Sequence, residues 1–151
     1  MGTARGLRLV EHLPAAFALV FDPQVLTAVM LSAVFGLFVG SIPGLSATMA
    51  VALLVPVTFF LPPIPAVACI VTATAMAIFA GDVPGALLRI PGTPASAAYC
   101  DEAYAMTRKG QVELALGAGL VFSVIGGLFG TIVLATAAPA LATVALGFSS
   151  F

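Results

Sequence analysis

The chain has 151 residues, of which 62% are hydrophobic and 7% charged, and its net charge is -1. Its mean hydropathy of +1.22 lies outside the range of soluble globular domains, so a lipid bilayer is the expected solvent. The slight negative charge argues against nucleic acid as a partner.

Residues 1–22 are predicted to form an interfacial segment that leads into the membrane region, residues 23–151. Arg5 and Arg8 precede an apolar run in the manner of a signal peptide. Glu11 and His12 interrupt that run, however, and no clear cleavage site follows. No charged residue lies between Asp22 and Asp82, or between Glu113 and Phe151. Both regions are therefore expected to lie in hydrocarbon.

Three apolar runs, at residues 24–39, 46–61 and 66–80, each end at a cluster of glycine and proline. Each measures roughly 15 residues, or about 22 to 24 Å of helix, which is short of the roughly 30 Å of hydrocarbon. The run at 114–137 is long enough to span it. The sequence predicts an all-α polytopic membrane protein with four or five apolar segments, in which short helices are tilted, paired, broken or re-entrant. Ordinary kinks are the alternative reading of the breaks.

Four Pro/Gly breaks occur, at residues 43–44, 62–63, 84–85 and 91–92, and two of them look alike. "SIPGLSATMA" at 41–50 and "RIPGTPASAA" at 89–98 share Ile-Pro-Gly followed by small and hydroxyl residues. Ser46 is a good N-cap for a helix that starts at Ala47. Thr93 is a good N-cap for a helix from Pro94 to Lys109, which Gly110 would end. The unpaired N–H groups and the dipole of such helix starts favour anions.

The break segments supply the candidate site. Serine and threonine hydroxyls donate to carboxylate oxygens, glycine admits the backbone closely, and arginine binds carboxylates in a bidentate manner. For each hydroxyl the alternative is a capping role alone. For Arg89 the alternatives are snorkelling, an ion pair with Asp82, or a topology signal. The candidate substrate-binding residues are Pro43, Gly44, Ser46, Thr48, Arg89, Pro91, Gly92, Thr93 and Ser96.

Asp82 is a candidate ion-coupling residue, because carboxylates at membrane depth are rare, although a salt bridge or a cap is the simpler role. The GxxxG pairs at 36–40 and 126–130 predict close helix packing. Cys69 and Cys100 lie in unlike surroundings and are expected to be small packing residues without a disulfide.

Topology has two competing cytoplasmic candidates by positive charge, the N-terminal arginines and the group at Arg89, Arg108 and Lys109. Three intervening spans would place them on opposite sides of the membrane. A re-entrant hairpin would place them on the same side.

The stretch "GLFVGSIPGLSATMAVALLVPVTFFLPP", followed by "LLRIPGTPASAAYCDEAYAMTRKGQVELALG", resembles the large membrane subunit of the tripartite tricarboxylate transporters (TctA type). The resemblance begins at about Leu13. It implies a secondary permease of the bacterial inner membrane, to which a periplasmic solute-binding protein delivers a di- or tricarboxylate and which a small membrane subunit assists. It also implies a role in the substrate path for six residues: Pro43, Gly44, Ser46, Pro91, Gly92 and Thr93.

This chain departs from the family in length, in "GDVPG", and in having Arg89 where an uncharged polar residue is common. We expect an N-terminal part, a split subunit or a truncated reading frame of a permease, with a carboxylate that the resemblance does not name. A membrane assembly or scaffold protein is the alternative. An enzyme is disfavoured, because the one histidine is His12 and no nucleophile with a base is evident. No metal site or cofactor is implied, and the coupling ion is H⁺ or Na⁺.

Overall fold

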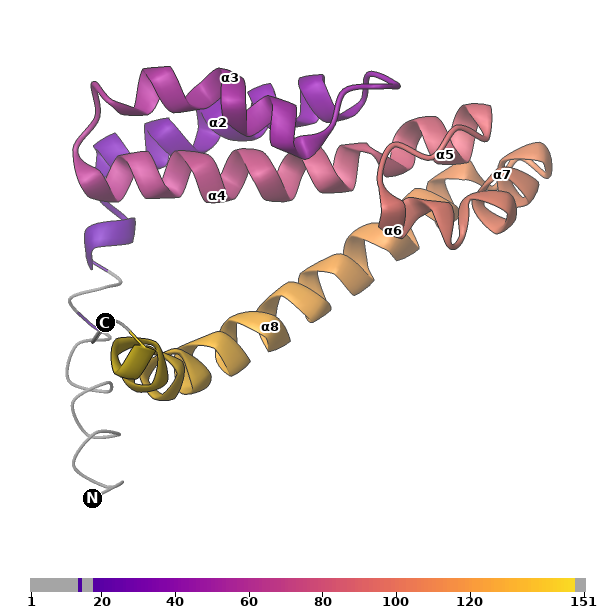
Figure 1. Cartoon of the computed structure of the whole chain (residues 1–151). Coiled ribbons are helices and arrows are strands. Elements are labelled where there is room, and N and C mark those ends of the chain that lie inside the picture. Colours follow the sequence, from indigo (N-terminus) through magenta and orange to yellow (C-terminus); the bar gives the residue numbers. More distant parts are fainter. Residues whose placement is uncertain (1–13, 15–17, 149–151) are drawn as a thin grey trace.

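The computed structural model describes residue 14 and residues 18–148, and these residues form helices and short connections without any strand (Figure 1). The predicted interfacial segment, residues 1–22, lies mostly outside the described residues. The helices are α2 (Pro23–Gly40), α3 (Ala47–Thr58), α4 (Pro63–Ala80), α5 (Asp82–Leu88), α6 (Pro94–Ala97), α7 (Cys100–Arg108) and α8 (Val112–Phe148).

Three stretches are long and apolar enough to cross a membrane, at Pro23–Gly40, Pro63–Leu88 and Val112–Ala138. The shorter apolar helix at Ala47–Thr58 accompanies them. The prediction of an all-α membrane protein is confirmed. The chain is an integral membrane protein by the length and composition of these helices.

Helices α2 and α4 lie side by side and run in the same direction (Figure 1). A Cβ placed on Gly36 would lie 3.0 Å from the Cα of Ala73, and one on Gly40 would lie 2.6 Å from the Cα of Ala77. Only glycine lets two helix backbones approach this closely. The close packing predicted at 36–40 is therefore confirmed.

Helix α3 returns antiparallel to these two helices and packs against both of them (Figure 1). It begins where the sequence predicted, with Ser46 as N-cap accepting a hydrogen bond from the N–H of Met49 at 3.3 Å. Pro56 lies inside its last turn, where its missing N–H removes the hydrogen bond to the carbonyl four residues earlier, and the helix ends at Thr58. Three passes along the bundle place the start of α2 and the end of α5 at its opposite ends (Figure 1).

The third apolar run ends at Ala80 as predicted, but the interruption lies at Gly81 and not at residues 84–85. Pro84 and Gly85 lie within α5, and Gly81 between α4 and α5 has the helical dihedral angles φ -64° and ψ -14°. Pro84 is tolerated because it sits in the first turn of α5, where backbone N–H groups lack intrahelical acceptors. The third apolar segment is therefore not short: α4 and α5 together give a 26-residue stretch.

The single helix predicted from Pro94 to Lys109 is also wrong, because the chain divides it into α6 and α7. Tyr99 between them has φ -130° and ψ 13°, which is not helical. The predicted end is confirmed, since Gly110 has a positive φ of 75°. Asp101 and Glu102 occupy the first turn of α7 and Arg108 the last, so their charges complement the helix dipole as predicted.

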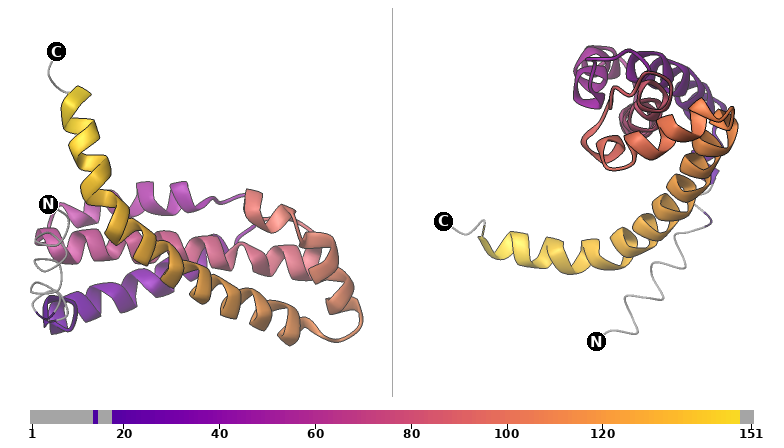
Figure 2. Two further views of the ribbon diagram at one scale, coloured as in Figure 1. Left: turned by 90° about the horizontal axis from the view of Figure 1, so that it is seen from below. Right: turned by 90° about the vertical axis from the view of Figure 1, so that its right-hand side faces the viewer.

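Helix α8 is longer than the predicted 114–137 and leaves the bundle beyond its first turns (Figure 2). Its membrane-length part, Val112–Ala138, has no buried side chain. A Cβ on Gly126 or Gly130 would meet nothing within 4 Å. The packing predicted for this second GxxxG pair is thus not made among the described residues.

Candidate functional site

The two Ile-Pro-Gly segments, far apart in the sequence, meet at one end of the bundle. A cavity of about 340 Å³ lies between the start of α3 and the start of α6, against the last turn of α4. Its lining combines both segments and consists of Ser46, Ala47, Thr48, Ile78, Gly92, Thr93, Pro94 and Ala95. Four of the nine predicted substrate-binding residues therefore face one space: Ser46, Thr48, Gly92 and Thr93.

The α3 side of this cavity carries the stronger anion-binding features. The N–H groups of Ala47 and Thr48 lie in the first turn of a 12-residue helix, where no intrahelical acceptor exists for them. The positive end of the helix dipole points the same way. No charged side chain lines the cavity. Its attraction for anions rests on backbone N–H groups and hydroxyls.

The α6 side is more self-contained. Thr93 caps the helix as predicted, with Pro94 as its first residue. The Thr93 Oγ1 accepts the N–H of Ser96 at 3.0 Å, and the Ser96 Oγ accepts the N–H of Thr93 at 3.0 Å. This reciprocal pair is a capping box, and Ser96 is buried. These two hydroxyls hold the loop in shape, as their capping role requires.

A close backbone contact fixes the second segment against α4. The N–H of Gly92 donates to the carbonyl oxygen of Gly81 at 3.2 Å. A Cβ on Gly92 would lie 2.7 Å from the Cα of Gly81, and one on Gly81 would lie 2.8 Å from the Cγ2 of Thr93. Both glycines are therefore needed for the approach that forms one wall of the cavity.

The remaining predicted residues lie outside the cavity lining. Gly44 has a φ of 93°, so it serves the turn that follows Pro43. Pro91 lies near Gly85, because a Cβ placed on Gly85 would lie 3.9 Å from the Pro91 Cα. These positions shape the two segments, and the contacts of the described residues give them no direct place in the cavity.

Arg89 does not pair with Asp82, one of the roles considered from the sequence. Its Nε donates to the Oδ1 of Asp101 at 2.7 Å, and both side chains are exposed to solvent. The Asp101 hydrogen bond and charge raise the pKa of Arg89, and Arg89 in turn lowers the pKa of Asp101. Arg89 ends α5 in the left-handed region, with a φ of 59°. It also lies outside the cavity lining.

Asp82 is buried at the start of α5 and accepts a hydrogen bond from the Tyr99 hydroxyl, at 2.6 Å from its Oδ1. Burial, together with this bond, raises the pKa of Tyr99 above its ordinary value, so the phenol stays a donor. The contact joins α5 to the junction of α6 and α7 across 17 residues of sequence. The salt-bridge role considered for Asp82 is absent among the described residues.

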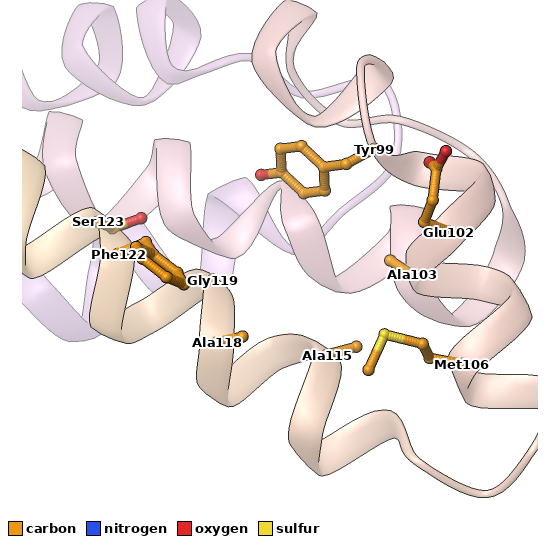
Figure 3. Close-up of a pocket in the computed structure, with 9 residues that line it drawn as sticks. All are labelled: Tyr99, Glu102, Ala103, Met106, Ala115, Ala118, Gly119, Phe122 and Ser123. Atoms are coloured by element: carbon orange, nitrogen blue, oxygen red, sulfur yellow. The ribbon is translucent and has the colours of Figure 1, made fainter.

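A second cavity, of about 470 Å³, lies between α7 and α8 next to this pair (Figure 3). In Figure 3 the ring of Tyr99 separates Glu102 from the α8 residues Phe122 and Ser123, and its hydroxyl points away from Glu102. Met106 of α7 reaches toward Ala115 of α8. The cavity is mostly apolar, with Tyr99 at the end that adjoins Asp82.

Sequence reasoning missed Tyr99 and Gly81. Tyr99 offered no local signal, because its role depends on a residue 17 positions earlier. Gly81 stood directly before the one carboxylate of an otherwise uncharged helical stretch, and that position could have identified it as a close-contact glycine.

Cys69 and Cys100 are free and buried, as expected, and their thiols donate to the carbonyl oxygens of Ala28 and Gly85. Among the described residues, no group of three or more His, Cys, Asp or Glu could hold a metal ion.

Comparison with known proteins identifies a relative and a family. The chain is 31% identical over 142 residues to an uncharacterized 52.8 kDa protein in the TAR-I ttuC' 3' region of Agrobacterium vitis. The match covers 94% of this chain and 28% of the relative, so the chain spans just over a quarter of the relative's length. No solved structure matches the chain. Residues 26–151 match the tripartite tricarboxylate transporter TctA family, and the chain therefore belongs to that family.

Proposed function

We propose that the chain forms part of a permease that imports di- or tricarboxylates across the bacterial inner membrane, driven by an ion gradient. In this proposal a periplasmic solute-binding protein delivers the substrate, and a small membrane subunit completes the transporter. Membership of a transporter family and three helices of membrane-spanning length support the proposal. The chain contributes one region of the permease, in keeping with its share of the relative's length.

The substrate carboxylate is proposed to bind in the 340 Å³ cavity between the two Ile-Pro-Gly segments. The single observation that carries this assignment is the meeting of Ser46 and Thr48 with Gly92 and Thr93 in one cavity. Broken or short helices whose N-termini converge on one space are the usual carboxylate site of secondary transporters. The volume suits a small ligand, since ligand pockets begin at about 300 Å³.

Within the cavity, one carboxylate group of the substrate accepts hydrogen bonds from the first N–H groups of α3. The Thr48 hydroxyl is exposed at this end and has no hydrogen-bond partner among the described residues, so it is free to donate to the substrate. The Thr93–Ser96 capping box holds the opposite wall, and the Gly81–Gly92 contact sets the width. Arg89 is proposed to act at the rim, where it leaves Asp101 for a second carboxylate group of the substrate.

The test is uptake of a panel of labelled di- and tricarboxylates into cells that carry the complete transporter locus. Thr48→Ala removes a free hydroxyl from the cavity, and Thr131→Ala is its matched control, because Thr131 lies exposed on α8 and bonds only the Gly127 carbonyl. We expect Thr48→Ala to raise the half-saturating concentration of one carboxylate about tenfold, because the variant loses a hydrogen bond to a charged group of the substrate. Thr131→Ala should behave as wild type.

Arg89→Gln and Thr93→Ala complete the panel. A rise in half-saturation for Arg89→Gln, at unchanged membrane levels, supports the rim role; loss of the protein from the membrane for Thr93→Ala indicates capping alone. Uptake that is indifferent to Thr48, Arg89 and Thr93 contradicts the assigned site. The absence of carboxylate uptake by the wild-type locus contradicts the permease function and favours the scaffold alternative.

A further inference from the structure

Asp82 is the one charged residue in the 26-residue helical stretch Pro63–Leu88, and only 8% of its surface is exposed. A buried carboxylate in apolar surroundings needs either full hydrogen bonding or a proton to be tolerated. Structural carboxylates at such depth are usually paired with a cation. Among the described residues the cations Arg89, Arg108 and Lys109 lie outside this stretch, and the ion pair of Arg89 is with Asp101.

The two oxygens of Asp82 have different surroundings. Oδ1 accepts the Tyr99 hydroxyl at 2.6 Å. Oδ2 faces α8, where a Cβ on Gly119 would lie 3.7 Å away, and it accepts no hydrogen bond from the described residues. Gly119 also lines the cavity between α7 and α8. One oxygen is thus held in place, and the other lies close to Gly119, which borders the cavity between α7 and α8.

Every element packed on α5 bears on the charge of this carboxylate. Helix α4 and helix α6 bring no charged group. From α7 come Tyr99 itself and Glu102, which lines the adjoining cavity, while the Cys100 thiol is occupied with the Gly85 carbonyl. Helix α8 presents Gly119, and its one charged residue, Glu113, is a turn and a half earlier. The other charges of these elements are Arg108 in the last turn of α7 and the Arg89–Asp101 pair. Among the described residues no cation forms an ion pair with Asp82.

Asp82 is also tied to the substrate cavity through the backbone. The preceding residue, Gly81, accepts the N–H of Gly92 and contacts Thr93, which lines that cavity. Tyr99 follows directly on the α6 turn that bears the capping box. A change in the Asp82–Tyr99 hydrogen bond is therefore expected to move both Gly81, which contacts Gly92, and the α6 turn that carries Thr93.

From this geometry we propose that Asp82 is the proton-binding residue of the transporter, with Tyr99 as its positioning partner. The proposal rests on the proposed carboxylate transport and specifies its coupling. In the step, a proton from water on one side of the membrane binds to Oδ2, which makes the carboxylate neutral while Oδ1 keeps the Tyr99 hydrogen bond. After the substrate has crossed, Oδ2 returns that proton to water on the other side.

The surroundings favour a proton over Na⁺. A sodium ion needs several oxygen ligands, whereas the hydrogen bonds of the described residues bring the Asp82 carboxylate one side-chain oxygen, that of Tyr99. No cluster of acidic or other metal-binding side chains accompanies it there. A proton needs a single oxygen, and Oδ2 of Asp82 accepts no hydrogen bond from the described residues.

The test compares uptake of labelled carboxylates by membrane vesicles from cells that carry the complete locus, supplied with the purified solute-binding protein of that locus, with and without an acid-outside pH gradient. Each variant provides its own reference, because the readout is the ratio of the two accumulation levels. For wild type we expect a ratio of up to about tenfold per pH unit, because one proton that moves down a gradient of one pH unit supplies the free energy of a tenfold accumulation. Asp82→Asn should lower the ratio to one, and the matched control Glu102→Gln, on the adjoining cavity, should keep it.

Tyr99→Phe tests the pair without removing the carboxylate. The phenol stabilises the charged form, so its loss should move the pH at which uptake is half-maximal upward. An independent readout uses the purified full chain in lipid, where infrared spectroscopy detects the carbonyl band of a protonated carboxylic acid. We expect such a band to titrate in wild type, to shift its midpoint in Tyr99→Phe, and to be missing in Asp82→Asn.

A pH-gradient ratio that survives in Asp82→Asn overturns the proposal while leaving carboxylate transport intact. Uptake that follows a sodium gradient and ignores the pH gradient does the same. An infrared titration that is identical in wild type and Asp82→Asn also overturns it, because no proton then binds at this residue. If wild-type vesicles accumulate no carboxylate under any gradient, the transport proposal itself has failed, and the coupling proposal fails with it.

Discussion

The α2–α4 bundle and the α5–α8 end are stabilised by different means. In the bundle, Gly36 and Gly40 meet Ala73 and Ala77 backbone to backbone. At the other end, specific polar contacts join the elements: Asp82 with Tyr99, Arg89 with Asp101, and Gly92 with Gly81. The bundle is a scaffold of small residues, and the polar end places groups whose charge and hydrogen bonds can change. The pair proposed for proton binding lies at this polar end, while the proposed carboxylate site also includes Ser46 and Thr48 at the start of α3 in the bundle.

The largest effect is expected from Gly40→Val in the bundle. A Cβ at residue 40 would lie 2.6 Å from the Ala77 Cα, so the branched side chain must push α2 and α4 apart. We expect a loss of more than about 3 kcal/mol of folding stability, or no folded protein. Thermal unfolding of the detergent-solubilised chain measures this. Gly126→Val is the matched control, because a Cβ there meets nothing within 4 Å. Equal stability of the two variants would contradict the packing account.

Gly92→Ala is expected to have an intermediate effect and to act on function more than on the bundle. The added methyl would lie 2.7 Å from the Cα and the carbonyl oxygen of Gly81, which breaks the contact that forms the cavity wall. We expect a destabilisation of about 1 to 3 kcal/mol and a loss of carboxylate uptake of at least tenfold. Gly117→Ala on α8, where a Cβ meets nothing, should change neither. Unimpaired uptake by Gly92→Ala would show that this wall is not part of the substrate site.

The smallest effect is expected from Asp101→Asn, which removes an exposed ion pair. Arg89 lowers the pKa of Asp101 in the folded chain, so the pair stabilises above the ordinary aspartate pKa and is lost as the pH falls through the lowered value. The melting temperatures of wild type and Asp101→Asn should therefore differ slightly at neutral pH and converge in acid. High salt should reduce the difference as well. A difference that grows toward acid pH would contradict the assignment.

The helix starts could be predicted because each depends on a few adjacent residues. Ser46 and Thr93 cap the helices for which they were proposed, and Pro94 stands at the first position. The errors have equally local causes. Pro84 was read as a break although the first turn of a helix admits proline, and Tyr99 was read as helical although its dihedral angles serve a distant carboxylate.

The candidate site was half predictable. Ser46, Thr48, Gly92 and Thr93 were selected from two similar motifs, and they face one cavity. Arg89 was selected for its chemistry alone, and its pairing with Asp101 depends on the position of α7, which the sequence pattern did not give correctly.

By itself, the sequence determined the solvent, the helical class, the positions of most helix starts and the family resemblance. Hydropathy, caps and turns act over a few residues, so the order of side chains along the chain is enough to read them. Only the tertiary structure decided that the two Ile-Pro-Gly segments meet, that α2 and α4 are parallel, and that Tyr99 holds Asp82. The hydrogen bond and the helix contact join residues 17 and 37 positions apart, and the two Ile-Pro-Gly segments begin 48 residues apart. They depend on which helix faces fit together, and that is a property of packing in three dimensions.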